Sequence, residues 1–195
     1  MLSNIVPQLI LLFRGEERFV NPDQDDNSED EDIGGLDAKD TFVLDAATWE
    51  TIGREMENSR MTVPTQPFGR PPRDINTKHD TFKAAEWSSW LLYYSTPLLQ
   101  GKLPGKYMDN WKDLVKIWGF ICSKDITKEQ IEECRELCIQ YVINYERLYF
   151  RGRWERLRLL KSNLHAILHV ADALTDLGPG PGWWGFPAER FNSTL

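Results

Sequence analysis

Hydrophobic residues recur at intervals of three and four along most of this chain, which is the spacing of one face of an α-helix. The stretch 46–58 shows this pattern, and Asp45 stands before it in a position suited to an N-cap. The longest pattern opens with Thr127, in the capping-box sequence Thr-Lys-Glu-Gln, and continues to about Phe150. We therefore predict one helix over 46–58 and a longer one from residue 128.

Glycine and proline divide the rest of the chain into further helices. A helical pattern resumes at Asp80 and is expected to end or kink at Ser95, because the following Pro97 disfavours α geometry before it. Another follows Gly105. The last two are expected over 164–176 and 188–195, with the sequence Gly-Pro-Gly-Pro-Gly between them, and Ser162 or Asn163 can cap the first. No alternating strand pattern of useful length occurs, so we predict an all-α fold, an irregular multi-helix bundle.

A run of acidic residues separates the start of the chain from this bundle. Residues 23–40 hold nine acids against Lys39 alone, a net charge of −8, so the remainder of a chain with net charge −7 sums to +1. Self-repelling sequence with few apolar residues cannot offset its ordering entropy. We therefore predict an apolar N-terminal segment over 1–20, an acidic disordered linker over 21–40 and a helical domain over 41–195.

The composition excludes several protein classes. With 195 residues, 41% of them hydrophobic, and eight tryptophans, the chain is long and apolar enough for one ordinary core. No apolar run is long enough for a transmembrane helix, and the start lacks the basic region and cleavage site of a signal peptide. The three cysteines make no framework of spaced pairs. We expect no membrane association and a nuclear or cytoplasmic rather than secreted protein.

Two pairs of residues with metal-binding chemistry lie four apart on predicted helices. His165 and His169 share one face and could ligate a metal, and Cys134 with Cys138 would complete a Cys₂His₂ zinc site. The cysteines, however, fall within an apolar stripe, where small hydrophobic residues belong. Buried thiols and hydrogen-bonded histidines are therefore the competing interpretation.

Basic and aromatic residues alternate after the long helix, which is a pattern found on nucleic-acid-binding surfaces. A solvated basic face is the competing interpretation. The large number of tryptophans also predicts that some remain exposed as an apolar docking patch. The basic residues proposed to bind nucleic acid are Arg151, Arg153, Arg156, Arg158 and Lys161.

Several segments, taken in order, carry a family resemblance that covers roughly residues 40–195. This ordered set resembles the C-terminal half of fungal transposases of the En/Spm (CACTA)-like class. The segments are Leu44-Asp45…Trp49…Ile52-Gly53-Arg54, Phe68-Gly69-Arg70, Ala85-Glu86-Trp87…Trp90…Tyr94, Leu99…Gly101…Leu103-Pro104…Tyr107, Tyr145-Glu146-Arg147…Tyr149, His165-Ala166-Ile167-Leu168-His169-Val170-Ala171-Asp172 and Gly178-Pro179…Trp184…Phe186-Pro187…Glu189-Arg190-Phe191.

The resemblance implies DNA transposition by an RNase H-like domain. Such enzymes hold two Mg²⁺ or Mn²⁺ ions with two aspartates and a glutamate, and the ions promote in-line attack on a phosphate. A helical region lies between the second aspartate and the glutamate, and the helices here would be that region. By this resemblance Glu189 is the third carboxylate, and His165 and His169 match the family's histidine pair.

The chain departs from the family in lacking the upstream strands and both aspartates. One carboxylate cannot assemble a two-metal site, so we expect a truncated product that does not cleave DNA on its own and holds no cofactor. Its expected partners are DNA or a separate transposase catalytic segment. A non-enzymatic helical protein-interaction module and a Cys/His metal-binding domain are the alternatives.

Overall fold

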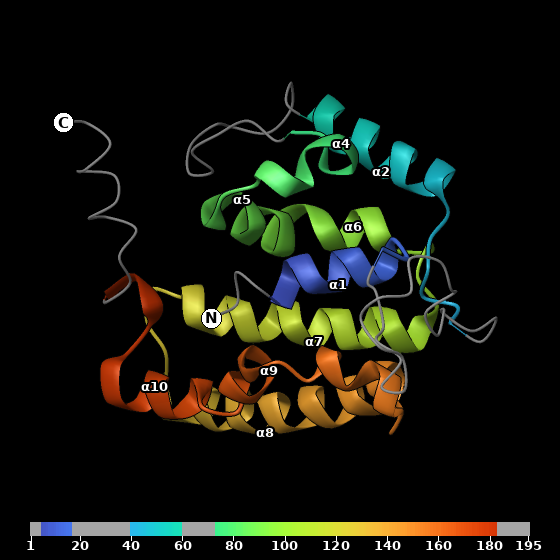
Figure 1. The fold of residues 1–195 in the computed structure, drawn as a ribbon. Helices are drawn as coiled ribbons and strands as arrows, with labels where there is room; N and C mark the ends of the chain where they lie inside the picture. Colours follow the sequence, from blue (N-terminus) through green and yellow to red (C-terminus); the bar gives the residue numbers. More distant parts are fainter. Residues whose placement is uncertain (1–4, 17–39, 60–72, 183–195) are drawn as a thin grey trace.

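The computed structural model describes residues 5–16, 40–59 and 73–182, and these residues form helices without a strand among them (Figure 1). The predicted all-α, irregular multi-helix bundle is therefore confirmed. The predicted disordered linker lies outside the described residues except for Asp40, which is buried. The helix expected over 188–195 also lies outside them. In the described part, no helix combines the length and apolarity needed to cross a bilayer.

The helices stack in three layers (Figure 1). The upper layer holds α2 (Ala46–Asn58), α4 (Ile75–Lys78), α5 (Ala84–Ser89) and α6 (Ser95–Leu99). The middle layer holds α1 (Ile5–Phe13) and α7 (Gly105–Cys122). The lower layer holds α8 (Lys128–Tyr145), α9 (Ser162–Ile167) and α10 (Val170–Leu177). Shorter turns of 3₁₀- or π-helix connect them, namely η3 (His79–Thr81), η4 (Trp90–Tyr94), η5 (Glu146–Phe150), η6 (Trp154–Leu159) and η7 (Gly180–Gly182).

Helix α1 runs between the upper layer and α7, and nearly all of its side chains are buried (Figure 1). A helix that is apolar on every side can be stable only inside a core. Even Gln8 is buried, and its amide nitrogen donates a hydrogen bond to the backbone oxygen of Leu159 over 3.4 Å. The segment predicted as separate over 1–20 thus contributes its helix to the same core as the domain predicted over 41–195.

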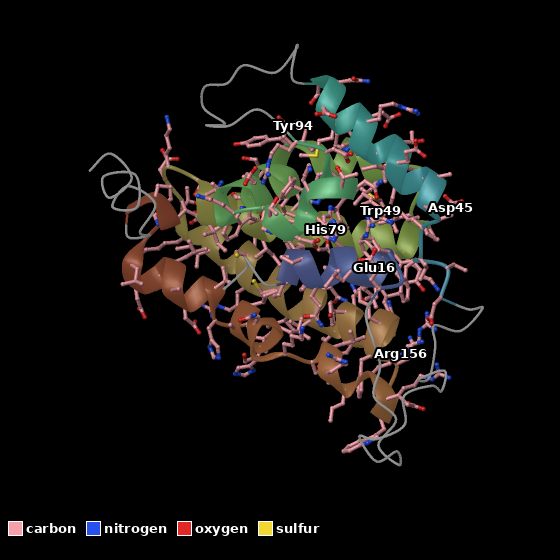
Figure 2. The ribbon with its side chains drawn as sticks, turned by 45° about the horizontal axis from the view of Figure 1, so that its top comes forward. Glu16, Asp45, Trp49, His79, Tyr94 and Arg156 are labelled. Atoms are coloured by element: carbon pink, nitrogen blue, oxygen red, sulfur yellow. The ribbon has the colours of Figure 1, made fainter. Side chains whose placement is uncertain are left out.

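The end of α1 is joined to the upper layer through Arg14. Its guanidinium lies over the ring of Trp49 in α2, 5.3 Å from the centroid, and donates to the side-chain oxygen of Asn76 in α4 over 2.8 Å. Glu16 accepts a further bond from Arg14 over 2.6 Å and approaches His79. Figure 2 shows Glu16, Trp49 and His79 around this end of α1.

The two predicted helix starts are confirmed by their capping geometry. The backbone N–H of Thr48 donates to a carboxylate oxygen of Asp45 over 2.6 Å, and hydrogen bonds from Thr48 hold the Asp45 pKa below its usual value. At α8, the N–H of Gln130 donates to the Thr127 hydroxyl, and the N–H of Thr127 donates back to the Gln130 side chain. Each cap satisfies backbone donors that a helix leaves unpaired.

Pro97 does not interrupt the chain where the sequence predicts. The helix continues through Ser95 to Leu99, and the turn Trp90–Tyr94 before it widens to π geometry, with the Ser95 N–H donating to the oxygen of Trp90. A proline ring clashes with the carbonyl four residues earlier, and a wider turn relieves that clash. The helix therefore does not end at Ser95, where π geometry gives way to α geometry.

The predicted helix over 164–176 is two helices instead of one. Between α9 and α10, the N–H groups of Leu168 and His169 donate to carbonyls three residues earlier, over 3.0 and 3.3 Å. This tighter turn breaks the α-helical hydrogen bonding although no proline or glycine stands there. The first of the two helices is preceded by Lys161, without a side-chain cap, and not by Ser162 or Asn163.

Aromatic rings from all parts of the chain meet in the centre of the bundle. Phe13 of α1 lies 5.6 Å from Trp111 of α7, and Phe42 lies 5.4 Å from Tyr149 of η5, measured between ring centroids. Tilted and edge-on pairs at such distances stabilise a core beyond the area that they bury. Because Tyr149 is also 4.9 Å from Tyr145, the cluster continues into the long helix α8.

A helical glycine in the upper layer is required by close packing. A Cβ on Gly53 would lie 1.9 Å from the Asp74 carboxylate, which accepts capping bonds, and 2.9 Å from the Asn76 Cβ. We predict that Gly53→Ala destabilises the fold by about 1–3 kcal/mol, as overpacking does. Gly119→Ala is the matched control, because nothing lies within 4 Å, and it should stabilise by up to about 1 kcal/mol. Urea denaturation measures both, and equal effects would contradict the prediction.

Candidate nucleic-acid interface

The basic segment, residues 151–161, follows η5 and contains the 3₁₀-helix η6. In a 3₁₀-helix, residues three apart lie directly above one another. Arg156 and Leu159 therefore share one side, and both are buried. Trp154 and Leu157 share another side, with 64% and 44% of their surface exposed. The short helix thus has a sharply divided inner and outer edge.

Arg156, labelled in Figure 2, belongs to the inner edge. Only 2% of its surface is exposed. Its guanidinium donates to both carboxylate oxygens of Asp40 and, over 3.1 Å, to the backbone oxygen of Tyr149. The expectation that Arg156 binds nucleic acid is therefore corrected, because its side chain is enclosed in the core. The turn of η6 directs it inward, where Asp40 neutralises its charge.

Arg151 approaches the same carboxylate from the end of η5. Its guanidinium lies 2.8 Å from Asp40, donates to the Tyr107 hydroxyl over 3.0 Å and to the oxygen of Leu148 over 2.9 Å. The residue has φ 56° and ψ 27°, the left-handed conformation that costs a non-glycine residue about 1–2 kcal/mol. These contacts offset that strain, so Arg151 holds the turn in place instead of extending toward a ligand.

The other three predicted basic residues are on the outside. Arg158 and Lys161 are exposed and Arg153 is half-buried. Together with Trp154 and Leu157 they form what we call the outer edge: Arg153, Trp154, Leu157, Arg158 and Lys161. Glu155 is the only acid in the sequence of the basic segment, and it lies one 3₁₀ turn before Arg158.

Trp154 is the exposed tryptophan that the outer edge presents. The sequence predicts that some of the tryptophans form an exposed patch, and those on the described α-helices and η4 do not supply it. Trp87, Trp90 and Trp111 are buried and Trp118 is half-buried, while residues 183 and 184 lie outside the described part. The spacing of Trp154 and Leu157 places both on one face of an α- or a 3₁₀-helix, but it does not tell whether that face is exposed.

The histidine pair is brought together as the sequence predicts. The Nε2 atoms of His165 and His169 are 3.2 Å apart, the rings are edge-on, and both side chains are exposed. Nδ1 of His169 lies 3.6 Å from the carboxylate of Asp172. Within the described ranges, no three or more His, Cys, Asp or Glu residues are grouped to hold a metal ion. Two imidazoles supply fewer donors than a zinc site uses.

The cysteine pair occupies a different environment from the histidine pair. Cys134 and Cys138 are fully buried in α8, with their sulfur atoms 3.9 Å apart. The contact with Cys134, reinforced by burial, raises the pKa of the Cys138 thiol. Burial also raises the pKa of Cys122, to about 12. The predicted Cys₂His₂ combination does not form among the described residues.

Glu189, the carboxylate matched by resemblance, lies outside the described residues. Comparison with models of known protein families, with curated proteins and with solved structures gives no significant match for this chain.

The first prediction for this region concerns the buried carboxylate of Asp40. Asp40→Asn leaves the Arg156 charge in the core without its counter-ion, and breaking a buried pair in this way costs about 3 kcal/mol or more. We expect urea denaturation at neutral pH to show that loss. Glu133→Gln is the control, because the pair between Glu133 and Lys116 is half-exposed on both sides and contributes at most about 1 kcal/mol. A loss as small as that of the control would contradict the enclosed ion pair.

The second prediction concerns pH and the neighbour of the histidine pair. A hydrogen bond from Arg135 over 2.6 Å lowers the pKa of Asp172. A lowered pKa means that this contact stabilises the fold above the usual carboxyl pKa and that the effect is lost as pH falls through the folded value. Arg135→Gln should raise the Asp172 pKa, measured by NMR titration of its carboxyl carbon. Arg147→Gln removes the same charge in η5, which follows the helix of Arg135, and should leave the Asp172 pKa unchanged; equal responses would disprove the contact.

Proposed function

We propose that this chain is a transposase-derived helical module that binds DNA through the outer edge and does not cleave it. The observation that carries the proposal is that some basic side chains of the basic segment are buried in the bundle and others are exposed. Arg156 and Arg151 hold the turn through contacts inside the bundle, whereas Arg158, Lys161 and the indole of Trp154 are exposed. Cations that position a phosphate backbone beside an aromatic ring are typical of nucleic-acid-binding surfaces.

The places of the resembling residues in the fold support the transposase origin. Asp45 caps α2, Gly53 allows α2 to approach Asp74, and Tyr149 lies in the central aromatic cluster. The positions of Gly53 and Tyr149 are requirements of one particular helix arrangement and not of helices in general. A resemblance located at such positions favours a shared helical architecture over a chance match.

The carboxylate chemistry supports binding without cleavage. In-line attack on a phosphate by the two-metal mechanism needs several carboxylates around the ions. Of the family's three, this sequence matches Glu189 alone. Mg²⁺ keeps its waters unless further carboxylates or phosphates replace them, so a lone glutamate holds it weakly.

The net charge of the chain restricts DNA binding to short-range contacts. The chain carries −7 overall, which opposes attraction to DNA at long range. The acidic run over 23–40 accounts for this excess, and the rest of the chain is nearly neutral. Binding should therefore depend on a few contacts. The affinity should fall only gradually as salt is added, as expected for roughly two or three phosphate contacts.

A second candidate function is that of a protein-interaction module. Ile139 and Ile143 lie four residues apart on α8, and about half of each side chain is exposed. Exposed apolar residues on one helix face favour a protein partner such as a separate transposase catalytic segment. This surface differs from the outer edge, so the two functions can be tested independently.

The DNA-binding proposal is tested by fluorescence anisotropy with a short labelled DNA over a range of salt concentrations. Replacing both Arg158 and Lys161 by alanine should weaken binding and reduce the salt slope by about 2, one for each lost phosphate contact. Replacing the exposed Lys112 and Lys128 removes the same charge elsewhere and should change the slope little.

Cleavage is assayed on the same preparations with Mn²⁺ and plasmid DNA, and no nicking is expected. Absence of DNA binding at low salt would overturn the proposal. Nicking that Glu189→Gln abolishes would overturn the non-cleaving part of it.

A further inference from the structure

The imidazoles of His165 and His169 face one another at the surface where α9 passes into α10. We infer that this pair binds a Cu²⁺ ion through its two Nε2 atoms, with water completing the coordination. The inference is independent of the proposed DNA binding and concerns different residues. It depends on the distance between the two nitrogens, on the anchoring of the backbone that carries them, and on the carboxylate of Asp172.

The distance between the two nitrogens fits a single bound ion. The Nε2 atoms of His165 and His169 are 3.2 Å apart. With metal–nitrogen bonds of about 2.0–2.1 Å, two imidazole nitrogens on one ion lie about 2.9 Å apart at a right angle and about 3.3 Å apart at a tetrahedral angle. The observed distance falls between these limits, so an ion can enter with little movement of either ring. A hydrogen bond between two neutral rings is the competing interpretation of this contact.

Both imidazoles are exposed, but the backbone that carries them is anchored in the core. Leu164 and Ile167 of α9 and Val170 of α10 are buried on either side of the two histidines in the sequence. A hydrated ion can therefore reach both nitrogens from the solvent while the fold stays closed. Ligands that are already positioned lose little conformational entropy when they bind.

The third feature is a carboxylate behind one of the imidazoles. Oδ2 of Asp172 lies 3.6 Å from Nδ1 of His169, and Arg135 donates to Oδ1 of the same carboxylate over 2.6 Å. A negative charge that faces Nδ1 favours a proton on that nitrogen, which leaves the lone pair of Nε2 for a metal. Histidine ligands in protein metal sites regularly have a carboxylate in this place, which orients the ring.

The small number of ligands favours Cu²⁺ over other ions. Imidazole nitrogens bind Cu²⁺ more tightly than the other divalent first-row metals. Zinc sites use three or four protein ligands, and within the described ranges no third His, Cys, Asp or Glu joins the pair to hold a metal. Mg²⁺ prefers oxygen ligands and should not compete. The thiols of Cys134 and Cys138 are buried, so they are closed to a hydrated ion.

The test is calorimetric titration of the full chain with CuCl₂, in a buffer that contains glycine as a weak competing ligand. We expect one Cu²⁺ per chain, weaker binding of Zn²⁺ and none of Mg²⁺. His165→Gln and His169→Gln should each weaken Cu²⁺ binding by about tenfold or more, since even a residue that only orients a ligand contributes about that much. His79→Gln removes the third histidine of the sequence, in η3, and should have no effect. Binding that survives either substitution in the pair, or that His79→Gln weakens equally, would overturn the inference.

Electron paramagnetic resonance of the Cu²⁺ complex counts the bound nitrogens directly. The native chain should show coupling to two imidazole nitrogens, and each histidine variant to one. Asp172→Asn should weaken binding by about tenfold and keep the two-nitrogen spectrum, because it removes only the group that orients His169. Asp176→Asn removes the same charge elsewhere on α10 and should change the affinity little. Equal effects of the two aspartate variants would overturn the role of Asp172, and a one-nitrogen spectrum of the native chain would overturn the site itself.

Discussion

The carboxylate of Asp40 is enclosed in the bundle and neutralises the buried guanidinium of Arg156, 116 residues further along the chain. A buried charge without its partner is strongly destabilising, so neither side chain can occupy this place alone. Arg151 reaches the same carboxylate from a left-handed backbone turn. The path of the chain from the end of η5 to Leu159 is set by this one ion cluster.

The ion cluster also determines what the chain shows to its surroundings. Because η6 is a 3₁₀-helix, turning Arg156 inward turns Trp154 and Leu157 outward. The same geometry that neutralises two arginines therefore exposes an aromatic ring at the surface. The buried side of η6 stabilises the fold, and its exposed side belongs to the proposed binding surface.

Local sequence signals predicted the helices that begin with a side-chain cap. Asp45 and Thr127 mark the starts of α2 and α8, because the capping bond involves only neighbouring residues. The same reasoning failed where the hydrogen-bond pattern changes within a helical stretch, as between Ile167 and Val170, since apolar periodicity is similar in α- and 3₁₀-helices.

For the candidate site, the sequence predicted which segment is basic but not which of its basic side chains are buried. Five basic residues were treated as equivalent because their spacing alone does not tell which one faces the core. The burial of Arg156 depends on Asp40, a residue that composition assigned to an acidic linker. A pair between residues so far apart in the chain cannot be predicted from the sequence around either residue.

One measurement separates a positioning role of Asp40 from a purely electrostatic one: the DNA affinity of Asp40→Asn, taken at a low temperature where circular dichroism shows the variant folded. Removing a negative charge beside the basic segment should by charge alone strengthen binding of a polyanion. If the ion cluster holds η6 in place, the affinity should instead fall, because Trp154 and the outer cations lose their fixed arrangement. An affinity that is unchanged or higher would contradict the central role of this buried pair.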